Sequence, residues 1–588
     1  MSSGDPSAAT EQGASSAHRP LDAVWLLLVA LAALVLWFSA ADHPLYTPDE
    51  GRYASASRVM AEGGSWLVPT YEGRPHLTKP PLTYWLQALC MRVFGPTEGA
   101  ARAPSLLAAT LTLLLTAWFT ARLWGRRVGT IAACLLSVTP LFLVMGRLAS
   151  TDALLTLFWT VALVAGALHA VERRKQWLAA LWLGTALAVM TKGPLGLVPV
   201  GLLVVWHALA GRWRAIAALW IPLGLPLALL PAVGWAAMVI RQQPQALEIW
   251  RHETLDRAAG SGDHPKPLWF YIPIFLGGLF PASAMLRLPG LNDPLRSLGA
   301  RLRRGDIATL LGLAVWLPFV MFSLIAGKLP SYLLPMAPPL AVATALAVDA
   351  LLPRSAVQTG GPTLARFAAP RRPPAVTLGL LIGAVVMATA AIGGAAALAP
   401  AFLPQAIVFA LLPPVIVWTN LQWRREPALR QRALVVAWLA FVASWLWAFE
   451  VEDEVRTPSN AATLVQEIRL ATAPAEPVVH RFGFRDPTIT FYLGRELVRI
   501  ADDDGVPIAA QGPRDRVVVL ADEDRWRAFS KRHPAQAKHW RIVSQWIRWP
   551  NDRVLVLRPK EPEPPAGDQG PSATQPSNAG AVSTPQAP

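Results

Sequence analysis

Apolar runs long enough to cross a lipid bilayer recur along most of this chain, and they limit the folds open to it. A membrane-spanning helix needs about 20 consecutive apolar residues. The first run extends from Leu21 to Ala41, and further runs begin near Ser105, Val128, Asp152, Trp177, Leu195, Ala215, Leu268, Ile307, Tyr332, Ala375, Ala401 and Ala433. The two runs on either side of Lys192 are short and could merge. The sequence therefore predicts an α-helical polytopic membrane protein with about 13 transmembrane helices.

The composition excludes an ordinary soluble enzyme. Of the 588 residues, 53% are hydrophobic and 15% are charged, whereas soluble domains carry about 25% charged residues. The 25 tryptophans agree with a membrane protein, because indole rings collect at the two bilayer interfaces. The two cysteines, Cys90 and Cys134, are too few for a disulfide scaffold or a cysteine-based metal cluster.

The formal net charge of +15 is explained by membrane topology. If the N-terminus is cytoplasmic, the basic residues gather in loops on the cytoplasmic side, as the positive-inside rule requires. These loops hold the basic clusters within 122–127, 173–175, 212–214, 287–304, 354–372 and 424–432. Because topology accounts for the charge, we predict no nucleic-acid partner.

Changes in composition along the chain predict four regions. A disordered cytoplasmic N-terminus (1–20) precedes a transmembrane domain (21–450), whose long first outer loop is 42–104. An odd number of helices then places region 451–560 on the outer side. Alternating apolar residues in 516–520 and 553–557 predict strands there, so we expect a small α/β domain. Residues 561–588 are rich in Pro, Gly, Ser, Ala and Gln, which predicts a disordered tail.

Ionisable residues are concentrated in the first outer loop, and charged groups at membrane depth are usually functional. The loop contains Pro48-Asp49-Glu50-Gly51-Arg52-Tyr53 and, further on, His76-Leu-Thr-Lys79-Pro-Pro. Each group also has a structural explanation. Asp49 could begin a helix and pair with Arg52, and Lys79 could extend its ammonium group to the interface.

Further ionisable groups are expected on the same outer side. Asp152 follows two other helix-capping residues, and Lys192 interrupts an apolar stretch before Gly-Pro. A cationic and aromatic segment contains His252 and His264, and a turn between two helices contains Lys328 and Tyr332. Acids and cations on one membrane face suit a lipid-borne anionic substrate such as a phosphate. A transporter would bury its charges near the midplane and often shows inverted repeats, and neither is evident.

In order along residues 20–350, these motifs resemble those of the bacterial lipid-linked glycosyltransferases. The resemblance rests on Pro48-Asp49-Glu50-Gly51-Arg52-Tyr53, Lys79-Pro80-Pro81-Leu82, Asp152 after Gly146-Arg147, Thr191-Lys192-Gly193-Pro194 and Gly327-Lys328-Leu329-Pro330 with Tyr332. Within the glycosyltransferase C type, the chain looks most like the lipid A aminoarabinose transferases. The protein O-mannosyltransferases are more distant relatives.

The resemblance implies an inverting, multi-pass enzyme of the bacterial inner membrane that takes a sugar from a polyprenyl phosphate. It places loop 42–104 and domain 451–560 in the periplasm. The implied catalytic residues are Asp49 and Asp152, and the implied substrate-binding residues are Glu50, Arg52, Tyr53, His76, Lys79, Lys192, His252, His264, Lys328 and Tyr332. The counterparts of Arg52, Lys79 and Tyr332 lie near the phosphate. Thr78 stands where we expect an acidic metal ligand, so no required metal or other cofactor is predicted.

Three functions stay open at this point. The first is transfer of 4-amino-4-deoxy-L-arabinose to lipid A. The second is transfer of mannose or another sugar to protein hydroxyls or to an envelope glycan. The third is transport of a lipid-linked sugar. The predicted partners are a polyprenyl-phosphate-linked sugar donor, lipid A or another envelope acceptor, and membrane lipid.

Overall fold

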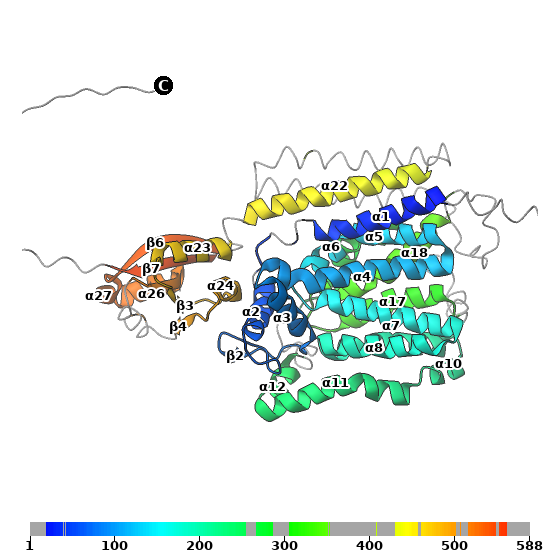
Figure 1. Ribbon diagram of the computed structural model, residues 1–588, viewed down its shortest axis with the longest axis horizontal. Helices are drawn as coiled ribbons and strands as arrows, with labels where there is room; N and C mark the ends of the chain where they lie inside the picture. Colours follow the sequence, from blue (N-terminus) through cyan, green and yellow to red (C-terminus); the bar gives the residue numbers. More distant parts are fainter. Residues whose placement is uncertain are drawn as a thin grey trace, which may run out of the picture. The chain divides into compact units, whose positions relative to one another are not determined.

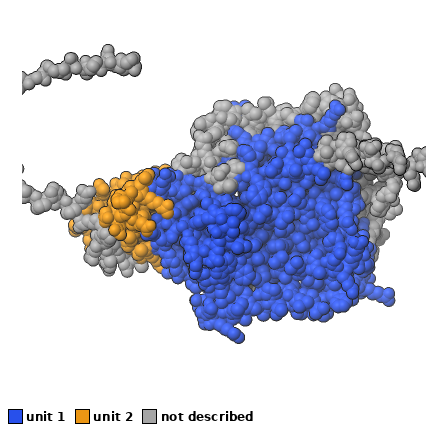
Figure 2. Space-filling model, in the orientation of Figure 1, with its two compact units in different colours: residues 1–467, 485–497 blue, residues 468–484, 498–588 orange. Residues whose placement is uncertain are grey.

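The structure is a computed structural model with two compact units. It describes residues 19–38, 40, 43–46, 48–253, 266–285, 305–350, 352, 407, 430–456, 460–500, 506, 515–548 and 552–560. The first unit comprises residues 1–467 together with 485–497, and the second comprises residues 468–484 and 498–588 (Figure 2).

The first unit is a helical membrane bundle (Figure 1). Within the described residues, 6 helical stretches are long and apolar enough to cross a membrane: α4 (Glu98–Trp124), α7 (Asp152–Glu172), α8 with α9 (Lys175–Leu209), α10 with α11 (Trp213–Gln242), α17 (Ile307–Leu324) and η6 with α18 (Pro330–Asp349). The pair α5 (Arg126–Ser137) and α6 (Pro140–Arg147), bent by 68°, would make a seventh. Shorter apolar helices cover Leu26–Trp37 within α1 (Arg19–Trp37), Leu268–Gly278, and Leu434–Phe449 within α22 (Arg430–Arg456).

These spans confirm an integral membrane protein built from helices. The runs that begin near Trp177 and Leu195 lie in one helical stretch, broken at η2 (Gly193–Leu197). The runs near Ala375 and Ala401 fall outside the described residues, as do the predicted disordered tail 561–588 and residues 1–18 of the predicted disordered N-terminus (1–20). Residues 19 and 20 of that N-terminus instead begin helix α1. The count of about 13 transmembrane helices therefore stays a prediction.

Small residues and buried hydroxyl groups explain how the helices pack. Gly129 on α5 lies against the backbone of Ala117 on α4, and Gly166 on α7 lies against Leu203. In a membrane, helices are not driven together by the hydrophobic effect, so their association depends on close packing. Small residues allow that close approach. Along α4, the hydroxyl groups of Thr112, Thr116 and Thr120 each donate to the carbonyl four residues earlier, at 2.7 Å. Hydroxyl groups within the apolar bundle are thereby satisfied.

A short helical layer carries the ionisable residues of the predicted first outer loop. It consists of α2 (Asp49–Ala61), a two-stranded hairpin of β1 (Thr70–Tyr71) and β2 (Arg74–Pro75), and α3 (Leu82–Phe94). Helix α2 begins after Pro48 with two acids in its first turn, where negative charge is stabilised by the helix dipole. Apart from Glu50, its buried residues are small residues and Met60, so the helix lies close to its neighbours.

One of those neighbours comes from far along the chain. Helix α24 (Pro487–Leu493) belongs to the first unit and packs on α2. Ser55 Oγ donates to the carbonyl of Pro487 at 2.7 Å, across 432 residues of sequence. Phe491 is buried among small residues that include Ala54 and Ala101. A C-terminal segment therefore supports the helix that begins at Asp49.

The second unit contains a five-stranded sheet of order β4-β3-β5-β7-β6. Its strands are β3 (Val478–Phe482), β4 (Val498–Ile500), β5 (Val517–Asp522), β6 (Trp540–Arg548) and β7 (Asp552–Pro559). Strand β3 pairs in parallel with β4 and β5, whereas β7 is antiparallel to β5 and β6. Helix α26 (Glu523–Arg532) buries Trp526 and Phe529 against the strands. The alternating segments seen in the sequence lie in β5 and β7.

The contact between α2 and α24 predicts a destabilising glycine substitution. A Cβ atom on Gly51 would stand 2.5 Å from Thr488 Oγ1 and 2.7 Å from Thr488 N. We expect Gly51→Ala to lower the thermal unfolding temperature of the purified protein, because overpacking costs about 1–3 kcal/mol. Gly234→Ala on α11 is the control, since nothing lies within 4 Å of that position. Equal unfolding temperatures for the two variants would contradict the tight α2–α24 contact.

Candidate active site

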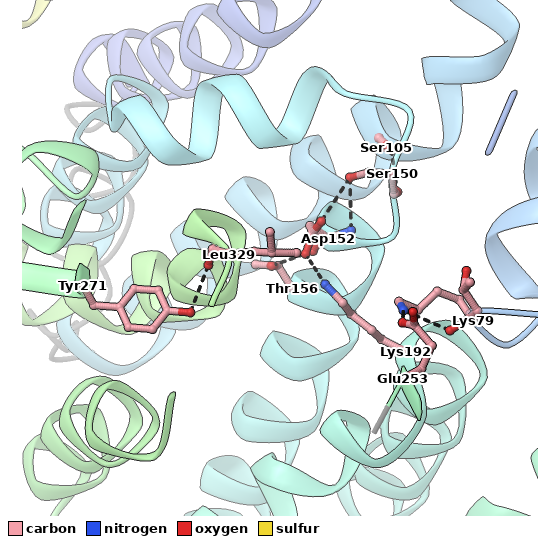
Figure 3. A network of polar contacts seen from close by, with 10 residues as sticks. Lys79, Ser105, Ser150, Asp152, Thr156, Lys192, Glu253, Tyr271 and Leu329 are labelled. Atoms are coloured by element: carbon pink, nitrogen blue, oxygen red, sulfur yellow. Dashed lines mark hydrogen bonds and ion pairs between the residues drawn. The ribbon is translucent and has the colours of Figure 1, made fainter. Parts of the chain in front are cut away.

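A buried ion pair joins the ends of two membrane helices. Asp152 is the first residue of α7, and Lys192 is the last residue of α8 (Lys175–Lys192). Lys192 Nζ lies 2.5 Å from Asp152 Oδ1, and the two side chains are 7% and 13% exposed (Figure 3). Lys192 Nζ also lies 5.1 Å from the centre of the Tyr332 ring. The structure therefore brings together three residues that the sequence predicted for the site.

A second ion pair involves an acid that the sequence analysis did not single out. Lys79 Nζ lies 2.6 Å from Glu253 Oε2 and donates to the carbonyl of Thr78 at 2.9 Å (Figure 3). Glu253 follows α12 (Ala246–Arg251) and is 12% exposed. Its neighbour His252, which was predicted, is exposed. In the sequence, Glu253 could have been noticed as an acid within a cationic and aromatic segment.

A third ion pair lies at the start of α2 and is the most open of the three. Asp49 Oδ1 is 3.6 Å from Arg52 Nη1, and the side chains are 76% and 45% exposed. Such an exposed pair contributes about 0–1 kcal/mol to stability. Asp49 is consequently the most accessible carboxylate of the three pairs.

Tyr53 shows that these acids share one electrostatic environment. Burial, followed by the negative charges of Asp152, Asp49 and, more weakly, Glu253, raises the pKa of Tyr53. Its hydroxyl group therefore stays protonated at physiological pH. It is also hydrogen-bonded to the side chain of Thr151. Tyr53 thus connects α2 to the residue that precedes Asp152.

His76 lies within a cluster of tyrosine rings. Its ring centre is 6.2 Å from that of Tyr53, 5.0 Å from Tyr71 and 5.9 Å from Tyr84. Burial, with Arg52 and Lys79 nearby, lowers the pKa of His76 to about 3. The imidazole is therefore neutral at physiological pH, and its main contacts are with aromatic rings. Arg52 and Lys79 both lower the pKa of His76. The motif that contains Arg52 and the motif that contains Lys79 therefore lie close together.

Glu50 has a different environment from the other predicted ligands. It is 1% exposed, and its two oxygens accept from Arg102 Nε at 2.9 Å and Nη2 at 2.7 Å. The same carboxylate accepts from the backbone N–H groups of Ala149 at 2.6 Å and Tyr46 at 2.8 Å. These four protein donors occupy its acceptor sites. Its position is that of a structural anchor beside Asp49.

Arg102 completes this anchor and was not identified from the sequence. It is 2% exposed, lies on α4 and also donates to the carbonyls of Ala40, His43 and Pro44. A charged residue close to the start of a membrane span was the available signal. Through Glu50 and Arg102, the start of α2 is tied to the loop that leads to Asp152.

The remaining predicted residues lie in or near the turn between α17 and α18 (Ala337–Asp349). Lys328 is 2% exposed and donates to the carbonyl of Lys266 at 3.0 Å. The Tyr271 hydroxyl donates to the carbonyl of Leu329 at 3.1 Å (Figure 3). The hydrogen bond from Lys328 thus stabilises this turn. Tyr332, which follows in the same turn, contacts Lys192. His264 lies outside the described residues.

The residue types near Lys79 offer little to a metal ion. The Thr78 hydroxyl lies 3.5 Å from His76 Nε2, where an acid would be a stronger ligand. Among the residues that the structure describes, no three His, Cys, Asp or Glu side chains are placed to share a metal ion. The prediction that no metal is required stays a prediction.

Comparison with known proteins finds relatives that are named for sugar transfer from lipid phosphates. The family model for dolichyl-phosphate-mannose-protein mannosyltransferase matches residues 78–237. An undecaprenyl phosphate-alpha-4-amino-4-deoxy-L-arabinose arabinosyl transferase from Edwardsiella ictaluri is 34% identical over 331 residues, which are 54% of this chain and 58% of the relative. The protein of that name from Pseudomonas aeruginosa is 34% identical over 332 residues, with the same shares. The chain thus matches less than two thirds of the length of these relatives.

A solved structure shares the fold over a longer part of the chain. The crystal structure of ArnT from Cupriavidus metallidurans bound to undecaprenyl phosphate matches with a TM-score of 0.72 at 22% identity. The match covers 91% of this chain and 98% of that chain. This likeness shows a common polytopic membrane fold. Together, the comparisons confirm the resemblance of this chain to the lipid-linked glycosyltransferases of the glycosyltransferase C type.

Proposed function

We propose that this chain is a glycosyltransferase of the bacterial inner membrane that takes its sugar from a polyprenyl phosphate. One observation carries the proposal: three cations, Arg52, Lys79 and Lys192, form ion pairs with three acids, Asp49, Glu253 and Asp152. The Tyr53 and His76 rings lie 6.2 Å apart between the motifs that carry them. The cations supply charge for a phosphate, and the acids supply a base or an electrostatic partner for the sugar.

The leaving group explains the need for cations. When the bond between the anomeric carbon and the phosphate oxygen breaks, a polyprenyl phosphate departs with an added negative charge. No proton donor is then required, and fixed positive groups stabilise the developing charge. Arg52, Lys79 and Lys192 are the described cations suited to this task. Each must exchange its carboxylate partner, wholly or in part, for a phosphate oxygen.

The attacking group decides the role of Asp49. Asp152 is bound to Lys192 and mostly buried, whereas Asp49 is exposed, so Asp49 is the carboxylate that can meet an incoming acceptor. With a hydroxyl acceptor it acts as a general base, a contribution typically worth about 10²–10⁴-fold. With a phosphate acceptor, which is already ionised, it orients the acceptor or stabilises positive charge on the sugar.

The reaction we favour is transfer of 4-amino-4-deoxy-L-arabinose to lipid A. The names of the relatives that are 34% identical support this sugar and an undecaprenyl phosphate donor. The mannosyltransferase family model over residues 78–237 supports the second candidate, transfer of mannose or another sugar to a protein hydroxyl group or envelope glycan.

The proposal includes a membrane topology. About 13 transmembrane helices would leave the N-terminus in the cytoplasm and would place the site on the periplasmic face. The α/β region 451–560 would then also be periplasmic. The basic clusters of the sequence support this orientation through the positive-inside rule.

The central test is lipid A itself. In a host that makes polyprenyl phosphate aminoarabinose, we expect mass spectrometry to show lipid A carrying this sugar when the chain is expressed. Asp49→Asn should abolish the mass increase, because the amide cannot accept a proton or balance positive charge, while membrane insertion stays normal. Unchanged lipid A with inserted wild-type protein would favour the second candidate. Near-normal transfer by the variant would remove Asp49 from its assigned role.

Lys79 is predicted to act mainly in donor binding. Lys79→Ala should raise the KM for the polyprenyl phosphate donor about 10-fold or more, since a hydrogen bond to a charged group contributes about 1.5–3 kcal/mol. Steady-state kinetics with purified protein would measure the change. Lys175→Ala, at the exposed start of α8, is the matched control. If both variants kept the wild-type KM, Lys79 would be an interfacial lysine.

Glu50 is predicted to hold the site together without meeting the substrate. Glu50→Gln should lower the free energy of unfolding by about 3–5 kcal/mol, because it leaves the buried Arg102 charge unbalanced. The thermal unfolding temperature and the rate of sugar transfer should both decrease. Glu62→Gln removes the acid of an exposed pair with Arg58 at the end of α2 and should change stability by about 0–1 kcal/mol. Full stability of the Glu50 variant would show that Glu50 is not the anchor.

A further inference from the structure

The membrane span that carries Lys192 is broken immediately after this residue. Helix α8 ends at Lys192, and the chain continues through η2 into α9 (Val198–Leu209). Gly193 takes a φ of +63°, a left-handed value that favours glycine. Pro194 follows, and it has no N–H group to donate to the helix ladder. The break therefore places Lys192 at a helix end, where carbonyl groups lack their regular helical partners.

A tryptophan on the neighbouring helix binds the segment after the break. Trp159 Nε1 on α7 donates to the carbonyl of Leu195 in η2 at 2.9 Å. The same carbonyl accepts from the N–H group of Val198, so the indole adds a second bond to it. Trp159 is 1% exposed and belongs to the same buried cluster as Ala188 of α8. This bond suits the bilayer core, which offers no water to a carbonyl group.

Helix α7 thus holds the broken span at two points. Asp152, its first residue, pairs with Lys192 before the break. Trp159, about two turns further along α7, binds Leu195 after the break. The segment η2 also lies tightly against α8, since a Cβ atom on Gly196 would stand 2.3 Å from the backbone nitrogen of Val189. These attachments fix the path of the backbone that carries Lys192.

The two attachments to α7 respond differently to a bound phosphate. In the proposed reaction, Lys192 exchanges Asp152 at least in part for a phosphate oxygen, which weakens the ion pair. The bond from Trp159 to Leu195 involves neither charge, so it persists. We propose that Trp159 is a positioning residue that holds Lys192 in place for the donor phosphate. This inference rests on the proposed function, because it takes Lys192 as a phosphate-binding cation.

Trp206 offers a matched comparison within the same span. It is also 1% exposed, and its Nε1 donates to the carbonyl of Asp306 at 3.1 Å. Trp206 lies in the last turn of α9, away from the break. Removing either indole N–H group costs one buried interhelical hydrogen bond, but only Trp159 is attached beside Lys192.

The inference predicts a selective effect of removing one N–H group. Trp159→Phe retains an aromatic ring and should weaken binding of undecaprenyl phosphate about fivefold, as expected for the loss of one hydrogen bond. Trp206→Phe should leave this affinity within about twofold, although both variants lose a bond and should unfold at a lower temperature. Titration calorimetry on the full-length protein in detergent would measure the affinity. A role for Trp159 in core packing alone would make the two variants alike.

Steady-state kinetics adds a measurement that packing alone does not change selectively. Because Lys192 is assigned to the leaving phosphate, Trp159→Phe should lower kcat about fivefold while the KM for the acceptor stays within about twofold. General loosening of the bundle would change both values or neither.

A double-mutant cycle tests whether Trp159 acts through Lys192. The background combines Asp152→Asn with Lys192→Gln and removes both charges, which avoids leaving one of them buried alone. In this background, Trp159→Phe should change the affinity for undecaprenyl phosphate by less than about twofold, because no ammonium group remains to be positioned.

The outcomes separate this inference from the proposed function. If Trp159→Phe weakened binding of undecaprenyl phosphate no more than Trp206→Phe, the assignment of Trp159 would be overturned while sugar transfer by wild type still stood. An equal effect of Trp159→Phe with and without the charged pair would overturn it as well. If wild type neither bound undecaprenyl phosphate nor transferred a sugar, the proposed function would fail, and the inference with it.

Discussion

The buried pair of Glu50 and Arg102 is the interaction on which the candidate site depends. Arg102 enters from membrane helix α4, and Glu50 belongs to the first turn of α2 beside Asp49. The carboxylate also accepts the backbone N–H of Ala149, three residues before Asp152. Two charges buried this deeply are stable only when every donor and acceptor is matched. This requirement fixes the two acid-bearing segments relative to one another, so the geometry of the site is set by a pair that the substrate does not need to touch.

Charge balance is the second constraint on the site. Three cations gathered at a membrane surface would repel one another, and the structure pairs each with a carboxylate. The pairs differ in exposure, from the open Asp49–Arg52 pair to the buried Asp152–Lys192 pair. The Asp49 carboxylate is open to solvent, whereas those of Asp152 and Glu253 are mostly buried.

Segments that are remote in sequence meet at α2. Its buried face of small side chains lets α24 approach until Gly51 touches Thr488 and Ser55 binds the Pro487 carbonyl. Residues 485–497 thus belong to the first unit although both flanking segments belong to the second. The neutral His76 and the tyrosine rings around it pack on the other elements of this layer. The helix that presents Asp49 is therefore held on several sides by uncharged contacts.

The sequence by itself determined that this chain spans a membrane and which motifs carry its charges, because apolar run length and basic loops are local properties. It also indicated Asp49, Arg52, Lys79, Asp152, Lys192 and Tyr332, since charged or aromatic groups beside such runs are costly without a purpose. Only the tertiary structure decided which acid pairs with which cation. The sequence offered a signal for Arg102 and Glu253 as charged residues, but it did not show that Arg102 binds Glu50 or that α24 packs on α2. An ion pair across 174 residues depends on which helices pack against each other. The period of a buried helix face does not reveal its partner in a single sequence.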